Sequence, residues 1–210
     1  MTLPTRLLCR ALGVLTACLL VTGCALLSTS PKVLAEKAAL TEVPHDLPQR
    51  TGRGDTVLVF RPKSTPFYDT TQMAYRTQPY EVAYFAEREW ADRPSHMLYP
   101  LVVWTLENTH AFRAVLTEPI AARYTYALRM EILELIQDFS PNSATLLLSL
   151  RFQLTDYGAK RVIATKEVSV REPMRERNSY AGVLAANEAT AKALQQMAQY
   201  VLQATDAPPE

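Results

Sequence analysis

The chain has 210 residues, and its 22 lysines and arginines stand against 21 aspartates and glutamates. With 48% hydrophobic residues, this length supports one domain with a good core plus appendages. A formal net charge of +1 without a lysine- or arginine-rich run argues against nucleic-acid binding, which needs clustered cations. Six glycines, three cysteines and 9% aromatic residues exclude collagen-like chains, disulfide scaffolds and global disorder.

Residues 1–23 have the pattern of a secretory signal peptide. Arg6 and Arg10 form a basic start without an acid, the apolar run 11–21 follows, and small residues precede Cys24. The apolar run is shorter than the roughly 20 residues that span a bilayer. Removal of the segment is therefore favoured over the alternative, a transmembrane anchor.

The end of this segment, Val-Thr-Gly-Cys, resembles the bacterial lipobox, in which the chain is cleaved between Gly23 and Cys24. Because Cys9 and Cys18 lie in the removed part, Cys24 is the only cysteine of the mature chain. A lone free thiol in an oxidising compartment would be a liability. We therefore predict that Cys24 is the lipid attachment site, carrying diacylglycerol on sulfur and an acyl chain such as palmitate on its amine. Three acyl chains make a permanent anchor.

Ala25 follows the cysteine, where lipoproteins retained in the inner membrane usually carry aspartate. Its absence favours the outer membrane, with the protein facing the periplasm. Removal of residues 1–23 leaves 20 lysines and arginines against 21 acids. The mature chain therefore has no polybasic patch to assist membrane binding.

Residues 24–54 are rich in serine, threonine, proline and small residues, and they show no sustained periodicity. We predict a flexible tether, which could approach about 100 Å when fully extended. The alternative is that residues 32–41 form a short strand or helix docked on the domain. The domain itself is expected over residues 55–204, followed by a C-terminal tail, 205–210.

The first half of the domain shows strand patterns and then a helix pattern. Residues 55–61 predict a buried strand that ends before a proline, which cannot donate to a ladder. Two short aromatic strands are expected at 73–76 and 80–85. Apolar residues at spacings of three and four predict a buried helix over 94–108, with Asp92 near its N-cap.

The second half predicts a meander. Residues 111–116 suit a strand, whereas 123–139 fit a strand or a helix by periodicity. The neighbours favour a strand, because turn residues and a long strand at 144–154 would complete a hairpin. A further strand at 162–170 makes three antiparallel strands.

The last element is predicted to be an amphipathic helix. Tyr180, Leu184 and Val201 belong to one apolar face at helical spacing, and Asn178 or Ser179 suits the N-cap. The polar side has no cationic band, so packing on the sheet is favoured over a membrane surface. The predicted fold class is α/β (mixed α+β), a single domain with one mixed sheet and an antiparallel meander covered by two main helices.

No catalytic constellation is found. The sequence lacks the nucleophile elbow, the zinc-protease helix motif, the phosphate-binding loop and the dinucleotide fingerprint. His45, His96 and His110 are spread along the chain and cannot easily hold one metal. Glu131 and Glu134 are interpreted as charged surface. We therefore expect no catalytic residue, no metal and no cofactor.

The most unusual segment is aromatic, with seven rings in 24 positions, interleaved with charged residues. These residues fit strand pairs and core, or a surface that recruits a partner or a lipid, because tyrosine, tryptophan and arginine combine large contact area with polar tips. The candidate partner or lipid surface consists of Tyr75, Arg76, Tyr80, Tyr84 and Trp90.

The same segment resembles the ABC-type transport auxiliary lipoproteins, the PqiC/YmbA-like group. The resemblance spans roughly residues 55–203 and favours the strand interpretation of 123–136. The blocks that carry it are 69–76, 79–86, 90–92, Pro94, 97–98, 100–101, 111–115, 137–139 and 180–187.

The resemblance implies a non-enzymatic outer-membrane lipoprotein that works with an ABC transporter whose periplasmic component is an MCE-domain protein. Such systems move lipids or other apolar solutes between the two membranes. The implied partners are the MCE-domain protein, the permease and ATPase of the system and, through the acyl chains, the outer membrane. A lipid ligand and a homo-oligomer are compatible with it. Two other classes stay open from the residues alone: a structural lipoprotein that braces or assembles an envelope complex, and an envelope hydrolase.

Overall fold

The computed structural model describes residues 34–52, 54–119, 122–142 and 144–206. The fold below is that of the compact unit that begins at Ala35. The predicted lipid attachment site Cys24 and the cleavage position Gly23 lie outside the described residues.

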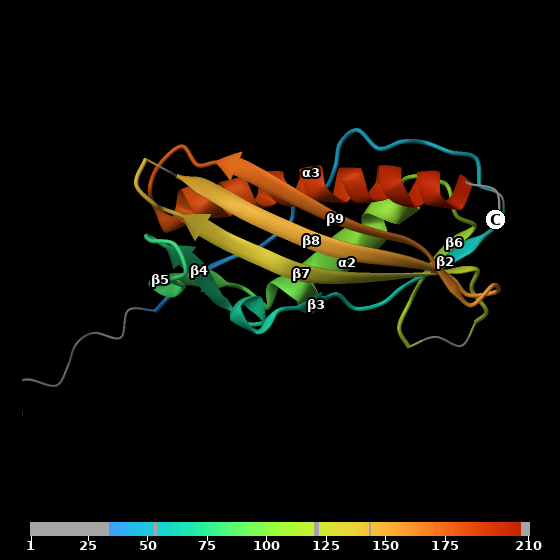
Figure 1. The fold of residues 1–210 in the computed structure, drawn as a ribbon, viewed down its shortest axis with the longest axis horizontal. Helices are drawn as coiled ribbons and strands as arrows, with labels where there is room; N and C mark the ends of the chain where they lie inside the picture. Colours follow the sequence, from blue (N-terminus) through green and yellow to red (C-terminus); the bar gives the residue numbers. More distant parts are fainter. Residues whose placement is uncertain (1–33, 53, 120–121, 143, 207–210) are drawn as a thin grey trace, which may run out of the picture. The chain divides into compact units, whose positions relative to one another are not determined.

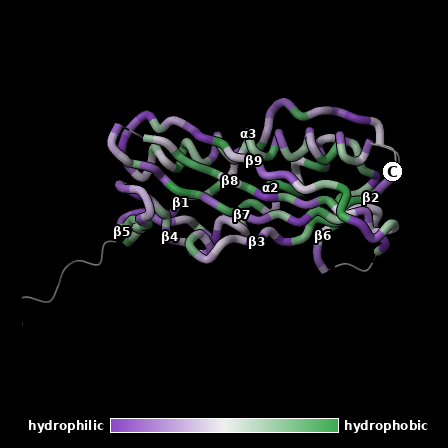
Figure 2. The backbone as a smooth tube through the Cα atoms, in the orientation of Figure 1, coloured by the Kyte–Doolittle hydropathy of each residue, from purple (hydrophilic) through white to green (hydrophobic). Residues whose placement is uncertain are grey.

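Three long antiparallel strands form one side of the sheet, with β9 at its edge: β7 (Tyr126–Asp138), β8 (Thr145–Asp156) and β9 (Arg161–Pro173). Hydrophobic and hydrophilic residues alternate along these strands (Figure 2), so one face is apolar. Ile132 of β7 pairs with Leu150 of β8, and both are buried. The predicted meander is confirmed, and with it the strand interpretation of residues 123–139.

Short strands line the other edge of β7. Strands β2, β3 and β4 pair with β7 one after another along its length, all parallel to it. β6 extends the sheet beyond β2, and β5 and then β1 extend it beyond β4, so the described strands form one nine-stranded mixed sheet. The bounds are β1 (Glu36–Ala38), β2 (Thr56–Val59), β3 (Lys63–Ser64), the 3₁₀ turn η2 (Pro66–Tyr68), β4 (Gln72–Arg76), β5 (Ala83–Trp90) and β6 (Ala114–Thr117).

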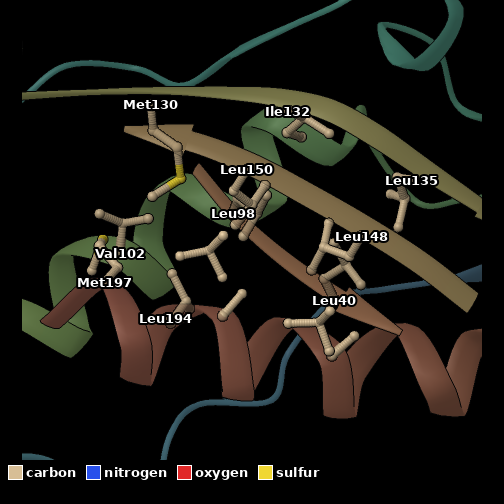
Figure 3. Packing of buried hydrophobic residues seen from close by; sticks show 14 of the residues in the cluster. Leu40, Leu98, Val102, Met130, Ile132, Leu135, Leu148, Leu150, Leu194 and Met197 are labelled. Atoms are coloured by element: carbon tan, nitrogen blue, oxygen red, sulfur yellow. The ribbon is translucent and has the colours of Figure 1, made fainter. Parts of the chain in front are cut away.

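Two helices, α2 (Pro94–Glu107) and α3 (Ser179–Asp206), pack on the apolar face of the sheet. Figure 1 shows α3 running along the three long strands, and α2 lying behind them at an angle to α3. Figure 3 shows side chains of both helices meeting those of the strands. The core residues labelled there are Leu40, Leu98, Val102, Met130, Ile132, Leu135, Leu148, Leu150, Leu194 and Met197. The predicted fold class, a single-domain mixed α/β sheet with two main helices, is confirmed.

The helix N-termini differ in how they are capped. The side-chain oxygen of Asn178 accepts a hydrogen bond from the Ala181 amide at 2.8 Å, which selects Asn178 among the two predicted caps of α3. Arg93 occupies the N-cap of α2 without a side-chain hydrogen bond. The carboxylate of Asp92 instead accepts the Arg93 amide at 2.7 Å.

Most of the predicted apolar face of α3 is buried, with Val201 completely so, but two of its larger members near the start of the helix are not. Tyr180 and Leu184, expected to face the core, are 54% and 46% exposed. The small residues Ala186, Ala189 and Ala193 are completely buried instead. Alanines let the helix backbone approach the sheet closely, and the larger side chains beside them are turned to the edge of the contact.

The prediction of a flexible tether over 24–54 is wrong for the residues from 35 onward. Glu36–Ala38 form β1, which pairs with β5, and Leu40 is only 4% exposed. The amide oxygen of Asn187 accepts the backbone amides of Thr41 and Glu42 at 2.8 and 3.1 Å. The alternative, a docked strand within residues 32–41, is what the structure shows.

The segment after β1 then follows α3 toward β2 (Figure 1). Gln195 donates to the carbonyl of Asp46 at 2.7 Å, and Arg50 donates to the carbonyl of Leu202 at 3.2 Å. Because these contacts recur along the helix, residues 35–52 are part of the domain. The tether can therefore extend only over the residues before Ala35.

Candidate functional site

An aromatic groove of about 480 Å³ opens at the end of the sheet where β4, β5 and the end of β7 meet the loop before α3. It includes part of the aromatic segment described above and residues from distant parts of the sequence. We call it the aromatic groove; it is lined by Tyr75, Thr77, Tyr84, Phe85, Ala86, Glu87, Phe139 and Arg177.

Three rings pack together in this groove. The centroids of Tyr75 and Phe85 are 4.5 Å apart, and Phe139 lies 6.2 Å from each of them. The ring of Phe139 stands edge-on to that of Phe85, at 86°. Such tilted and edge-to-face contacts are the favoured geometries for aromatic pairs. The groove therefore has a preformed apolar wall, to which Tyr75 adds a polar tip.

Arg177 adds a positive charge beside this apolar surface. Its guanidinium lies over the ring of Phe139, 5.4 Å from the centroid, and it donates a hydrogen bond to the Phe139 carbonyl. A cation stacked on an aromatic face keeps its charge while covering apolar surface. The groove thus has a positive charge beside its apolar wall.

An ion pair joins β4 to β7 next to the groove-lining residues Tyr75 and Phe139. Arg76 of β4 donates to the carboxylate of Asp138 of β7 at 2.7 Å, and it lies 3.5 Å from Glu134. Burial of Asp138 alone would raise its pKa, but the hydrogen bonds from Arg76 and Ser140 outweigh this and lower the pKa to about 2. The same bond raises the pKa of Arg76. Both groups are charged at neutral pH, and they hold β4 against β7.

The five residues predicted to form one surface have different environments in the structure. Tyr75 and Tyr84 line the groove, and the Tyr84 hydroxyl donates to the carbonyl of Phe67 at 3.0 Å. Arg76 does not line the groove but is held in the ion pair with Asp138, whereas Tyr80 is completely exposed in the turn between β4 and β5.

Trp90 is not a surface residue. It is 3% exposed and belongs to the core, and its amide donates to the carbonyl of Thr71 at 2.7 Å. The reason is β1: Ala38 pairs with Trp90 and covers the edge of β5 that would otherwise be open. The sequence allowed a docked strand within residues 32–41, but nothing in it indicated that this strand would pair with β5 and cover Trp90.

Phe85, Phe139 and Arg177 were not among the predicted surface residues. Phe85 belongs to the aromatic segment, but it directly follows Tyr84 in β5. Strand alternation sends adjacent side chains to opposite faces, so it gave no sign that both residues would line the groove. Phe139 and Arg177 lie 54 and 92 residues further along the chain. Their approach depends on the parallel pairing of β4 with the end of β7, with Arg76 opposite Asp138, which periodicity does not encode.

Two other features, the predicted surface acids and a second groove, involve ion pairs. Glu131 lies 3.7 Å from Arg151, and Glu134 lies beside Arg76, so both predicted surface acids are in ion pairs. A larger groove of about 850 Å³ runs along α3, but Glu172 in its wall is paired with Lys192 at 2.5 Å.

The described residues contain no group of three or more histidine, cysteine, aspartate or glutamate side chains placed to hold a metal. Within the same part of the chain, no helix is both long and apolar enough to cross a membrane.

The fold and the groove define the class: a single-domain α/β protein that presents an aromatic groove at one end of a mixed sheet. A family model described as the ABC-type transport auxiliary lipoprotein component matches residues 39–198. The chain therefore belongs to the ABC-type transport auxiliary lipoprotein family, a lipoprotein family of the cell envelope. The match begins within the segment that packs on α3.

Solved structures share the fold. Protein XCC0632 from Xanthomonas campestris is similar over 82% of this chain and 96% of its own, with a TM-score of 0.70 and 20% identity. An uncharacterized protein is similar over 80% of this chain and 98% of its own, with a TM-score of 0.64 and 11% identity. At these identities the likeness shows the fold alone. No curated protein matches the sequence.

Proposed function

We propose that the protein is an outer-membrane lipoprotein on the periplasmic face, serving as a non-enzymatic docking component of an ABC transporter. In this proposal Cys24 carries the lipid, and the periplasmic component that docks is an MCE-domain protein linked to the permease and ATPase. The cargo would be lipids or other apolar solutes. Family membership supports the transporter role, and Cys24 followed by Ala25 supports the anchor and its membrane.

The observation that carries the docking role is the aromatic groove beside an open strand edge. Among the described strands, β1 pairs with β5 only at Arg88–Trp90, which leaves Ala83–Glu87 at the edge of the sheet. An extended segment of a partner could pair with this edge by backbone hydrogen bonds and insert an apolar side chain among the rings. Arg177 would meet an acidic or carbonyl group of the same segment.

Blocking the groove without removing its rings tests this proposal. Ala86 is exposed and lines the groove, so Ala86→Arg fills the space while leaving Tyr75, Phe85 and Phe139 in place. Thr165→Arg is the matched control, because Thr165 is exposed on β9, outside the groove. Full-length acylated proteins would be isolated from solubilised envelope, and their bound chains identified by mass spectrometry.

We expect the MCE-domain protein to accompany the wild type and Thr165→Arg, and to be lost from Ala86→Arg while thermal unfolding is unchanged. Equal recovery with both variants would contradict the groove as the docking site. Recovery of wall or outer-membrane structural proteins without any transporter component would favour a bracing lipoprotein.

A further inference from the structure

The turn between β4 and β5 exposes apolar side chains. Tyr80 is completely exposed, and Val82 is 38% exposed. Tyr80 has a φ of 68°, in the left-handed region that residues other than glycine seldom adopt. The turn thus holds a tyrosine out from the surface, although burial would be expected for a ring of this size.

The chain enters the domain beside this turn. β1 runs parallel to β5, with Glu36 opposite Arg88 and Ala38 opposite Trp90. Because the two strands run in the same direction, the chain before Glu36 arrives from the side on which β5 begins. β5 begins at Ala83, directly after the turn.

Chain length limits how far this end can lie from the anchor. The eleven residues 24–34 separate the predicted lipidated Cys24 from Ala35, and in any conformation they span at most about 40 Å. β7 has 13 residues and is roughly 43 Å long. The opposite end of the sheet, with the turn 157–160 between β8 and β9, would approach the membrane only if the tether ran fully extended along the whole domain.

The chemistry of the turn suits the interfacial region of a bilayer. Tyrosine rings with polar tips are favoured at the headgroup level. From Thr77 to Glu87 the chain contains two glutamates and no lysine or arginine. Attraction to anionic lipids is therefore not the source of binding, and contact through Tyr80 and Val82 would be insensitive to salt.

Resting on the proposed function, which supplies the anchor at Cys24, we infer that the turn 77–82 contacts the headgroup region of the membrane that holds the lipid. Tyr80 and Val82 insert at the interface. This contact orients the domain so that the aromatic groove opens close to the membrane surface. A partner docked in the groove is thereby held near the membrane.

Site-specific fluorescence tests the inference on the acylated full-length protein. The thiol of Cys24 is blocked by the lipid, so an introduced cysteine is the single reactive thiol of the mature chain. Glu81→Cys places a polarity-sensitive dye in the turn while keeping Tyr80 and Val82, and Ala159→Cys places it in the opposite turn as the matched control. The protein would be reconstituted in phosphatidylcholine vesicles with brominated acyl chains, which quench dyes near the membrane.

We expect several-fold stronger quenching at position 81 than at position 159, unchanged by added salt and reduced by Tyr80→Asp. Only protein that floats with the vesicles is compared. In such protein, equal quenching at the two positions, or no quenching at position 81, would overturn the inference. Protein that does not float would overturn the anchor as well, so flotation separates failure of the proposed function from failure of the orientation alone.

Discussion

Asp138 illustrates how one residue controls the geometry of the groove. Asp138 is 5% exposed, and its carboxylate accepts a hydrogen bond from Arg76 of β4. It directly precedes Phe139, one of the three groove rings. The Phe139 amide in turn donates to the Arg76 carbonyl at 2.8 Å. The ion pair and the backbone bond together fix the position of Phe139 relative to β4.

The lowered pKa of Asp138 predicts a pH-dependent contribution to stability. A carboxyl group with a pKa near 2 in the folded protein and near 3.8 when unfolded stabilises the fold above about pH 4 and loses this contribution as the pH falls toward 2. Asp138→Asn should therefore lower the free energy of unfolding by about 2 kcal/mol at neutral pH. Urea denaturation as a function of pH measures this; a constant difference between the two proteins down to pH 2 would contradict it.

The predictable parts of the fold are the long elements. β7, β8 and β9 extend over 12 or 13 residues each, enough for the alternation of apolar residues to be recognised, and α3 extends over 28. β1 and β3, with three and two residues, are too short to carry a period. The groove depends on where such short strands pair. The sequence therefore predicted some of the residues that line the groove, but not that they come together.

The close approach of α3 to β7 makes Gly182 irreplaceable. A Cβ atom at this position would lie 2.0 Å from Cδ of the buried Gln137. Although alanine is normally the better helix former, Gly182→Ala should destabilise the protein by about 1–3 kcal/mol.

A second substitution provides the control for this prediction. In a Gln137→Ala background the obstructing side chain is absent, so Gly182→Ala should cost little there. Chemical denaturation of the single and double variants measures the difference. The same cost in both backgrounds would show that the close contact is not the cause.

Packing of the segment after β1 is also testable. Leu40 is buried in the core, whereas Leu34 is 83% exposed. Leu40→Ala should cost about 2–4 kcal/mol of unfolding free energy, and Leu34→Ala should change it by less than about 0.5 kcal/mol. If thermal and urea unfolding showed no effect of either substitution, residues 35–52 would be a tether after all.

For the whole molecule, the packing of residues 35–52 on α3 shortens the tether. The predicted reach of about 100 Å assumed free residues up to 54; with the domain starting at Ala35, it falls to about 40 Å. If Cys24 carries the proposed lipid, the domain would be held this close to the membrane, which suits a docking component at that surface. Partners anchored in the other membrane would have to extend toward it.

The anchor itself is tested by substitution at and after the cleavage site. Cys24→Ser should abolish incorporation of labelled palmitate and release the protein from the membrane fraction, because the remaining chain has no polybasic patch. Ala25→Asp should keep the label and move the protein to the inner membrane. Labelled palmitate in Cys24→Ser would refute the attachment site.

We propose above that the aromatic groove docks a transporter component in the envelope. The most direct measurement places a photo-crosslinking amino acid at Thr77, on the groove, and at Thr165, on the exposed face of β9, in the acylated protein in intact cells. If the groove is the docking site, we expect position 77 to crosslink to an MCE-domain protein and position 165 not to do so. Crosslinks from position 77 only to wall or structural outer-membrane proteins would contradict it.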